Sequence, residues 1–69
     1  MEMQPVESSN IKAIGYDQAT QTLRMEFRNG SIHDYPDTSP ADHTNLMAAA
    51  SHGKHFHQHI RSRKSVKVA

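Results

Sequence analysis

The alternation of apolar and polar residues predicts three β-strands in the first half of the chain. Residues 22–28 (TLRMEFR) carry an apolar side chain at every second position, which is the pattern of a half-buried strand. The β-branched and aromatic residues of 11–16 predict a strand before it, and 31–35 (SIHDY) predict a returning strand after it. We therefore expect an antiparallel meander of strands at about 11–16, 22–28 and 31–35.

The Asn-Gly pair at 29–30 predicts a hairpin whose register has two alternatives. A two-residue loop would pair Phe27 with Ile32 and turn Tyr35 to the polar side. A type I turn with a glycine bulge would pair Phe27 with Ser31 and bury Tyr35. A one-residue slip moves every side chain to the opposite face. We expect the bulged register, which turns Ile32 outward, where it could serve an interface.

Helical signals dominate the second half of the chain. The sequence SPAD at 39–42 places a serine N-cap before a proline and an acid, which is typical of a helix start, and Gly53 indicates the end of that helix. Apolar residues four apart at positions 56 and 60 predict a second, shorter helix. We expect helices at 40–51 and 54–61. The fold class is then α+β, a three-stranded antiparallel β-meander followed by one or two C-terminal helices.

The remaining segments suggest one small domain with polar ends. Residues 1–10 lack periodicity and are expected to form a flexible lead-in, 11–61 a single domain, and 62–69 (SRKSVKVA) a basic C-terminal tail, either loose or a short strand. A chain of 69 residues buries only roughly 60% of its unfolded surface. Because it contains neither Cys nor Trp to strengthen its core, we expect a homodimer to supply further burial.

Composition excludes several protein classes. Zero cysteines exclude a disulfide framework and a thiolate zinc site. The first ten residues are polar and acidic, unlike a signal peptide, and no apolar run approaches the roughly 20 residues of a membrane helix. We therefore expect a cytoplasmic protein without a membrane partner.

Histidine is concentrated in one short segment, SHGKHFHQHIRSR at 51–63. Four of the six histidines fall within eight residues. Imidazole suits zinc, copper or nickel, and helical spacing could bring His52, His55 and His59 together as a metal site. No cysteine or HExxH motif accompanies them, so metal binding is the third of our functional hypotheses.

Basic residues accompany these histidines. Residues 1–39 hold three basic and six acidic groups, whereas 40–69 hold five basic groups and one acid. Basic side chains bind phosphates by releasing counterions, and histidine can hydrogen-bond a phosphate or stack on an unpaired base. The candidate nucleic-acid-binding residues are Lys54, His55, His57, His59, Arg61, Arg63, Lys64 and Lys67. The isoelectric point of about 8.2 is below the value above 9 that marks a strongly basic domain.

The order of motifs resembles the KTSC domain, a family of small domains that takes its name from the C-terminal extension of some lysyl-tRNA synthetases. The matching strings are SSNIKAIGYD, FRNGS and the spacing Ser-x-Gly-x-x-Phe-x-x-x-Ile-Arg at 51–61. The chain departs from the family in having His33 in place of a tyrosine and His57 in place of an asparagine, and in lacking a tyrosine soon after Arg61.

The resemblance implies a compact α+β domain with a link to RNA or DNA, and it implies no known catalysis. We find no nucleophile or phosphate-loop spacing, so no catalytic residue or cofactor is predicted. The leading hypothesis is a small non-enzymatic module that binds RNA or DNA or acts as an accessory. The alternative is a protein interaction or homodimerisation module.

Overall fold

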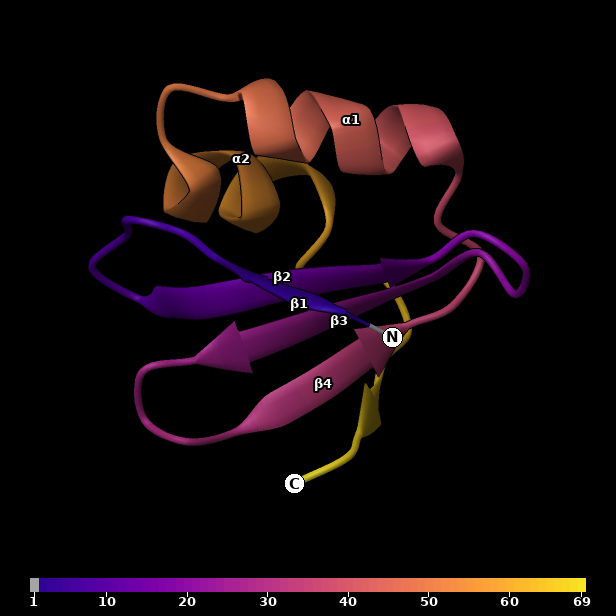
Figure 1. Ribbon diagram of the computed structural model, residues 1–69, viewed down its shortest axis with the longest axis horizontal. Helices are drawn as coiled ribbons and strands as arrows, with labels where there is room; N and C mark the ends of the chain where they lie inside the picture. The colour runs from indigo at the N-terminus through magenta and orange to yellow at the C-terminus, as the bar shows by residue number, and fades with distance from the viewer. Residues whose placement is uncertain (1) are drawn as a thin grey trace.

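The computed structural model describes residues 2–69 and consists of one antiparallel sheet with two helices on one side of it (Figure 1). The five strands follow one another across the sheet in the order β1-β2-β3-β4-β5. Neither helix is long or apolar enough to cross a membrane, within the part of the chain that the structure describes. The elements are β1 (Met3–Pro5), β2 (Ile11–Asp17), β3 (Thr22–Phe27), β4 (Ile32–Tyr35), α1 (Pro40–Ala48), α2 (His52–His59) and β5 (Val66–Lys67).

The α+β class and the central meander are confirmed, whereas three strands are too few. The segment predicted to be a flexible lead-in contains β1, which pairs with β2 so that Met3 lies opposite Gly15. The basic tail contains β5, which pairs with β4 so that Lys67 lies opposite His33. Both added strands are short and lack a period-two pattern. They become strands because they pair with the edge strands of the meander, β2 and β4. The local sequence of each segment does not reveal that pairing.

The hairpin between β3 and β4 adopts the bulged register. Leu23 lies opposite Tyr35, and the Phe27 N–H donates to the Ser31 carbonyl at 2.9 Å. Gly30 has a φ of +93°, a conformation that side chains rarely adopt, and it therefore supplies the turn. Tyr35 is buried as expected, and Ile32 is half-buried on the outer face of the sheet.

The helix start at Ser39 is confirmed, but both helix boundaries after it differ from the prediction. Ser39 and Asp42 form a reciprocal capping box. α1 ends at Ala48, because Ala49 is extended with φ −67° and ψ 143°. The Ser51 hydroxyl then caps α2 by accepting from the Lys54 N–H at 3.3 Å. Gly53 therefore lies in the first turn of α2 and does not terminate α1.

The core lies between the sheet and the two helices. Phe56 of α2 contacts Tyr35 of β4, their ring centroids 5.5 Å apart, and Leu46 of α1 is fully buried. The one buried polar side chain among the described residues, Thr38, donates its hydroxyl to the Tyr35 carbonyl at 2.9 Å. The core cluster comprises Ile11, Ile14, Leu23, Met25, Tyr35, Leu46, Phe56 and Ile60.

Candidate nucleic-acid interface

Three segments that are distant in sequence meet at one end of the sheet: the turn at 8–10, the β3–β4 hairpin and the first turn of α2. The Arg28 Nε donates to the Ser8 carbonyl at 2.6 Å, and the Arg28 N–H donates to the Asn10 carbonyl at 3.0 Å. A Cβ atom at Gly53 would lie 3.3 Å from the Ser8 Oγ, so glycine permits the close approach of α2 to this turn. The motifs that carry the family resemblance therefore converge in space.

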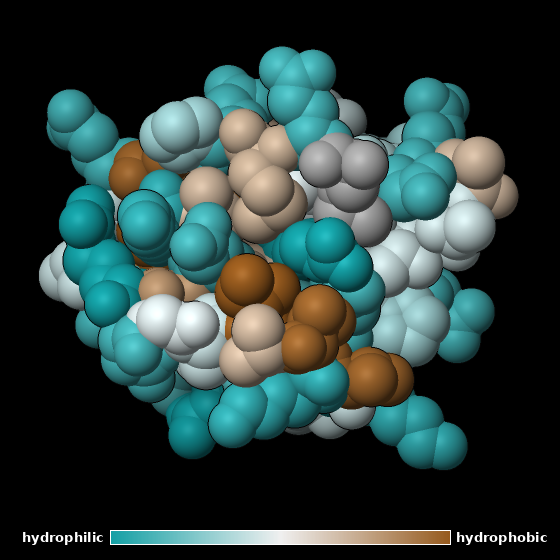
Figure 2. Space-filling model, turned by 60° about the horizontal axis from the view of Figure 1, so that its bottom comes forward, coloured by the Kyte–Doolittle hydropathy of each residue, from teal (hydrophilic) through white to brown (hydrophobic). Residues whose placement is uncertain are grey.

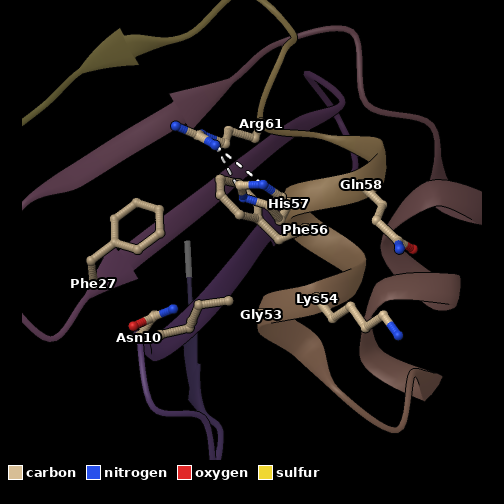
Figure 3. Close-up of a pocket in the computed structure, with 9 residues that line it drawn as sticks. Asn10, Phe27, Gly53, Lys54, Phe56, His57, Gln58 and Arg61 are labelled. Carbon is tan, nitrogen blue, oxygen red and sulfur yellow. Dashed lines mark hydrogen bonds between the residues drawn. The ribbon is translucent and has the colours of Figure 1, made fainter.

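Two adjoining cavities, of about 510 and 670 Å³, open where these segments meet, and Figure 3 shows the residues that line the first of them. Asn10, Phe27, Phe56 and Arg61 line both cavities, so we treat them as one aromatic groove. The first cavity is completed by Ile11, Gly53, Lys54, His57 and Gln58. The second is completed by Ser9, Arg28, Asn29, Ser31, His33 and Tyr35.

The floor of the aromatic groove is built from aromatic rings. Phe27 and Phe56 pack edge to face with ring centroids 5.4 Å apart. Phe56 is only 7% exposed, whereas Phe27 is half-buried and presents part of its ring to the groove. His33 packs edge to face on Phe27, with ring centroids 5.9 Å apart. The groove thus offers an apolar surface on which a flat ring can stack.

The cation at the centre of the groove is Arg61. One terminal nitrogen of its guanidinium lies 3.2 Å from Nδ1 and 3.3 Å from Nε2 of His57. A nitrogen that is almost equidistant from both ring nitrogens lies over the ring face, since an in-plane position would collide with the carbon between them. We therefore interpret the contact as stacking, and Arg61 keeps its donors available (Figure 3).

Neither Arg61 nor Lys54 forms an ion pair in the part of the chain that the structure describes, residues 2–69. The ion pairs there join Lys12 to Glu26, Arg24 to Asp34 and Arg63 to Asp42. Lys54 extends along the outer side of α2, away from Phe27 (Figure 3). Among the described residues, no carboxylate therefore neutralises the Arg61 guanidinium in the groove.

The eight candidate residues do not form a single surface. Lys54, His57 and Arg61 line the groove. His55 and His59 pack on each other, with ring centroids 4.5 Å apart, and neither lines the groove. Burial lowers the pKa of His55 from its ordinary value of 6.5, and the neighbouring His59 lowers it further.

The other basic candidates lie in the C-terminal segment. Arg63 donates to the Asp42 carboxylate at 2.9 Å and lowers the pKa of that carboxyl. It therefore ties the segment after α2 to the start of α1. Lys64 is exposed in the loop before β5, and Lys67 lies in β5 opposite His33.

The proposed metal ligands are not gathered into one site. His52 Nδ1 lies 2.9 Å from the Leu46 carbonyl oxygen and so makes a hydrogen bond within the helical layer. Over residues 2–69, no group of three or more His, Cys, Asp or Glu side chains is arranged to hold a metal ion. The pair of His55 and His59 remains, which is fewer than the three protein ligands of a typical zinc site.

Several groove residues come from the N-terminal half, where sequence reasoning placed no binding residue. Asn10 falls in the predicted flexible lead-in, and Phe27 and Arg28 fall in the strand predicted at 22–28. The available signal was the set of family strings SSN and FRNG, which lie far from the basic segment in sequence. Only the meander brings them against α2.

Comparisons with known proteins agree with this architecture. The model of the KTSC domain family matches residues 7–63. A crystal structure of a KTSC domain protein from Yersinia pestis has a TM-score of 0.94 and 33% identity, and the match covers 99% of this chain and 97% of that one.

Sequence relatives are of two kinds. A protein of Tsukamurella paurometabola is 46% identical over 52 residues, which are 75% of this chain and 78% of that protein. A lysine–tRNA ligase of Nostoc punctiforme is 40% identical over 57 residues, 83% of this chain but only 10% of the ligase. The family model, the relatives and the solved structure agree, and the chain belongs to the KTSC domain family.

Proposed function

We propose that this chain is a non-enzymatic module that binds single-stranded nucleic acid, RNA foremost, in its aromatic groove. The observation that carries the proposal is an aromatic floor, Phe27 on Phe56, beside the unpaired cation of Arg61. Single-strand binders combine these two features, because bases stack on aromatic rings while cations contact the phosphates. Stacking of this kind contributes about 1–3 kcal/mol per base.

The shape of the site favours an unpaired base. Phe27 is half-buried between β3 and α2, so a ligand must enter a concave groove to reach its ring. A base in a duplex is stacked on its neighbours and cannot enter such a groove, whereas a base in a loop or single strand can. Asn10 borders both cavities and carries an amide that could hydrogen-bond the edge of an inserted base.

The relatives support RNA as the ligand class. Three of them, from Nostoc and Trichormus, are named lysine–tRNA ligases, and the matching segment makes up 10% of each. In those proteins the segment accompanies an enzyme that, by its name, acts on a tRNA. A module that binds unpaired RNA would be a suitable accessory to an enzyme of that kind.

An NMR titration tests the proposal. A short single-stranded RNA should shift the amide resonances of Asn10, Phe27 and Arg61, and the same strand annealed to its complement should not. The Arg61→Glu variant should bind about tenfold or more weakly, because it replaces the central cation with an anion. Lys12→Glu makes the same charge change at an exposed residue outside the groove and should bind nearly as well as the wild-type chain.

Salt dependence completes the test. If the groove contacts phosphates, affinity should fall as salt is added. Arg61→Glu should make the slope of log affinity against log salt concentration shallower by about 1, the value for one lost phosphate contact. The proposal fails if single-stranded RNA and DNA leave the groove amides unshifted at low salt. It also fails if Lys12→Glu weakens binding as much as Arg61→Glu, since binding would then follow net charge and not the groove.

A further inference from the structure

The two edges of the sheet differ in how they are protected. The β1 edge contains Pro5, which has no N–H to offer another strand. Proline on an edge strand is a common device against edge-to-edge pairing. The β5 edge, Val66–Lys67, contains no proline and is the last strand of the sheet. Its outer backbone groups are therefore available to a further strand.

Backbone hydrogen bonds show which groups of β5 face outward. The Val68 N–H donates to the Ile32 carbonyl at 2.7 Å, toward β4. Because successive N–H groups along a strand point to opposite sides, the N–H and C=O of Lys67 point toward the free edge. Lys67 therefore presents the donor and acceptor that an antiparallel partner strand requires.

Exposed apolar side chains are concentrated at the same edge. Val66 is 62% exposed and Val68 is 47% exposed, and they are the exposed large hydrophobic residues found in the described part of the chain. Val66 pairs with Asp34, so the two valines lie on the sheet face away from the helices, the face on which Ile32 is also half-buried. Figure 2, in which the bottom of the Figure 1 view is turned toward the reader, shows a compact group of hydrophobic side chains surrounded by hydrophilic ones.

We propose that a second copy of this chain pairs antiparallel with β5, across a two-fold axis at Lys67, to give one continuous sheet. Such an axis would make Lys67 exchange both backbone hydrogen bonds with Lys67 of the second copy. It would also place Val66 opposite Val68 of the second copy, so that the exposed valines cover each other. The same chain thus supplies both the strand and the apolar complement, which an unrelated partner would have to provide separately.

Charge on the two faces is compatible with this pairing. On the valine face the nearest charges belong to the Arg24–Asp34 ion pair, whose Nε–Oδ1 distance is 2.7 Å, so the face is locally neutral. On the other face the axis brings two Lys67 side chains together. Their mutual repulsion opposes association at low salt, and added salt should screen it. We therefore expect a dimer that tightens as the salt concentration rises.

Sedimentation velocity over a range from micromolar to millimolar protein tests the pairing. The wild-type chain should change reversibly from monomer to dimer. Substitution of both Val66 and Val68 by serine should weaken association by about tenfold or more, because it removes the apolar contact. Both sites are exposed, so the variant should keep the backbone NMR spectrum of the folded chain outside β5.

A charge-exchange experiment tests the position of the axis. Lys67→Glu alone should associate about as weakly as wild type, because two glutamates also repel. An equimolar mixture of wild type and Lys67→Glu should form a heterodimer more tightly than either forms a homodimer. Lys64→Glu makes the same charge change in the preceding loop and should give no such preference.

Three outcomes would overturn the inference. They are a monomer at every concentration, association that is insensitive to the two valines, and a mixture of wild type and Lys67→Glu without heterodimer preference. None of them bears on RNA binding in the aromatic groove, which the Arg61→Glu titration tests separately.

Discussion

The aromatic groove and the outer face of the sheet both combine apolar and charged side chains, but they arrange their charges differently. On the outer face the Arg24 guanidinium makes two hydrogen bonds to the Asp34 carboxylate, at 2.7 and 2.9 Å. In the groove Arg61 stacks over His57 and has no carboxylate partner among residues 2–69. The outer face therefore satisfies its cations internally, whereas the groove leaves one available to an anion.

The aromatic residues show the same contrast. Phe27 and Phe56 lie on the helix side of the sheet and line the groove, whereas the outer face carries aliphatic residues such as Ile32 and Val66. An aliphatic surface can be covered by another aliphatic surface, and an aromatic floor can stack on a base. We therefore propose different partners for the two regions, a second copy of the chain for the outer face and a nucleic acid for the groove.

The largest effect should come from removing the ring at the centre of the groove. Phe56→Ala should reduce the free energy of unfolding by about 3–5 kcal/mol, because it deletes a buried aromatic side chain that packs on Phe27 and Tyr35. A chain of 69 residues has a stability of roughly 3–10 kcal/mol, so the loss is severe. Urea denaturation measures it. Ile32→Ala on the outer face is the matched control and should lose much less.

A smaller effect is expected where α2 approaches the turn at 8–10. Gly53→Val should destabilise the fold by about 1–3 kcal/mol, because its side chain would collide with Ser8. Gly53→Ala is the control. Its Cβ meets only the Ser8 Oγ at 3.3 Å, and alanine favours a helix over glycine, so its stability should stay near that of the wild type. If valine is as well tolerated as alanine in thermal unfolding, the close approach does not require glycine.

Acidification should produce a moderate loss of stability through two half-buried histidines outside the groove, His43 and His55. His43 stacks on Tyr16 with ring centroids 4.6 Å apart, and burial lowers its pKa below the ordinary 6.5. The pKa of His55 is also lowered. As the pH falls below about 6.5, the unfolded chain takes up protons that the folded chain does not, so the free energy of unfolding declines.

Urea titrations at a series of pH values measure this decline. His43→Gln, which cannot be protonated, should make the stability less dependent on pH between about 7 and 5. A chain whose stability is constant over that interval would contradict the burial argument.

The smallest effect should come from freeing the cations of the outer face. Substituting both Glu26 and Asp34 by their amides releases Lys12 and Arg24 from their carboxylates. We expect affinity for single-stranded RNA to rise by less than about threefold, a general charge effect, because that face has no aromatic ring on which a base can stack. Fluorescence anisotropy measures it. A larger gain, with new amide shifts on β3 and β4, would show that unpaired cations suffice and that the aromatic floor is dispensable.

Much of the fold could be predicted because its signals are local. The alternation in β3, the Asn-Gly turn and the Ser39 capping box each depend on residues within a few positions of one another. The bulged register was predictable because it alone buries Tyr35. The outer strands were missed because β1 and β5 are only three and two residues long, and they are strands only through their partners.

The residues of the aromatic groove, our candidate binding site, were predictable only in part. The C-terminal basic segment includes Lys54, His57 and Arg61, which do line the groove. The same segment includes Arg63, which is occupied by Asp42 at 2.9 Å, a contact across 21 positions that spacing does not reveal. Proximity in sequence did not reveal that Arg63 is paired with an acid in the folded chain.

The sequence by itself determined the meander, the start of α1 and the family, because period, capping and turn chemistry act over a few residues. The tertiary structure decided which side chains meet. It placed Phe27 against Phe56 and Ser8 beside Gly53, and within residues 2–69 it left Arg61 without a carboxylate partner. These contacts join segments more than twenty residues apart, and they exist because the sheet and α2 bury a common core. Short-range sequence patterns do not specify which distant segments will pack together in that core.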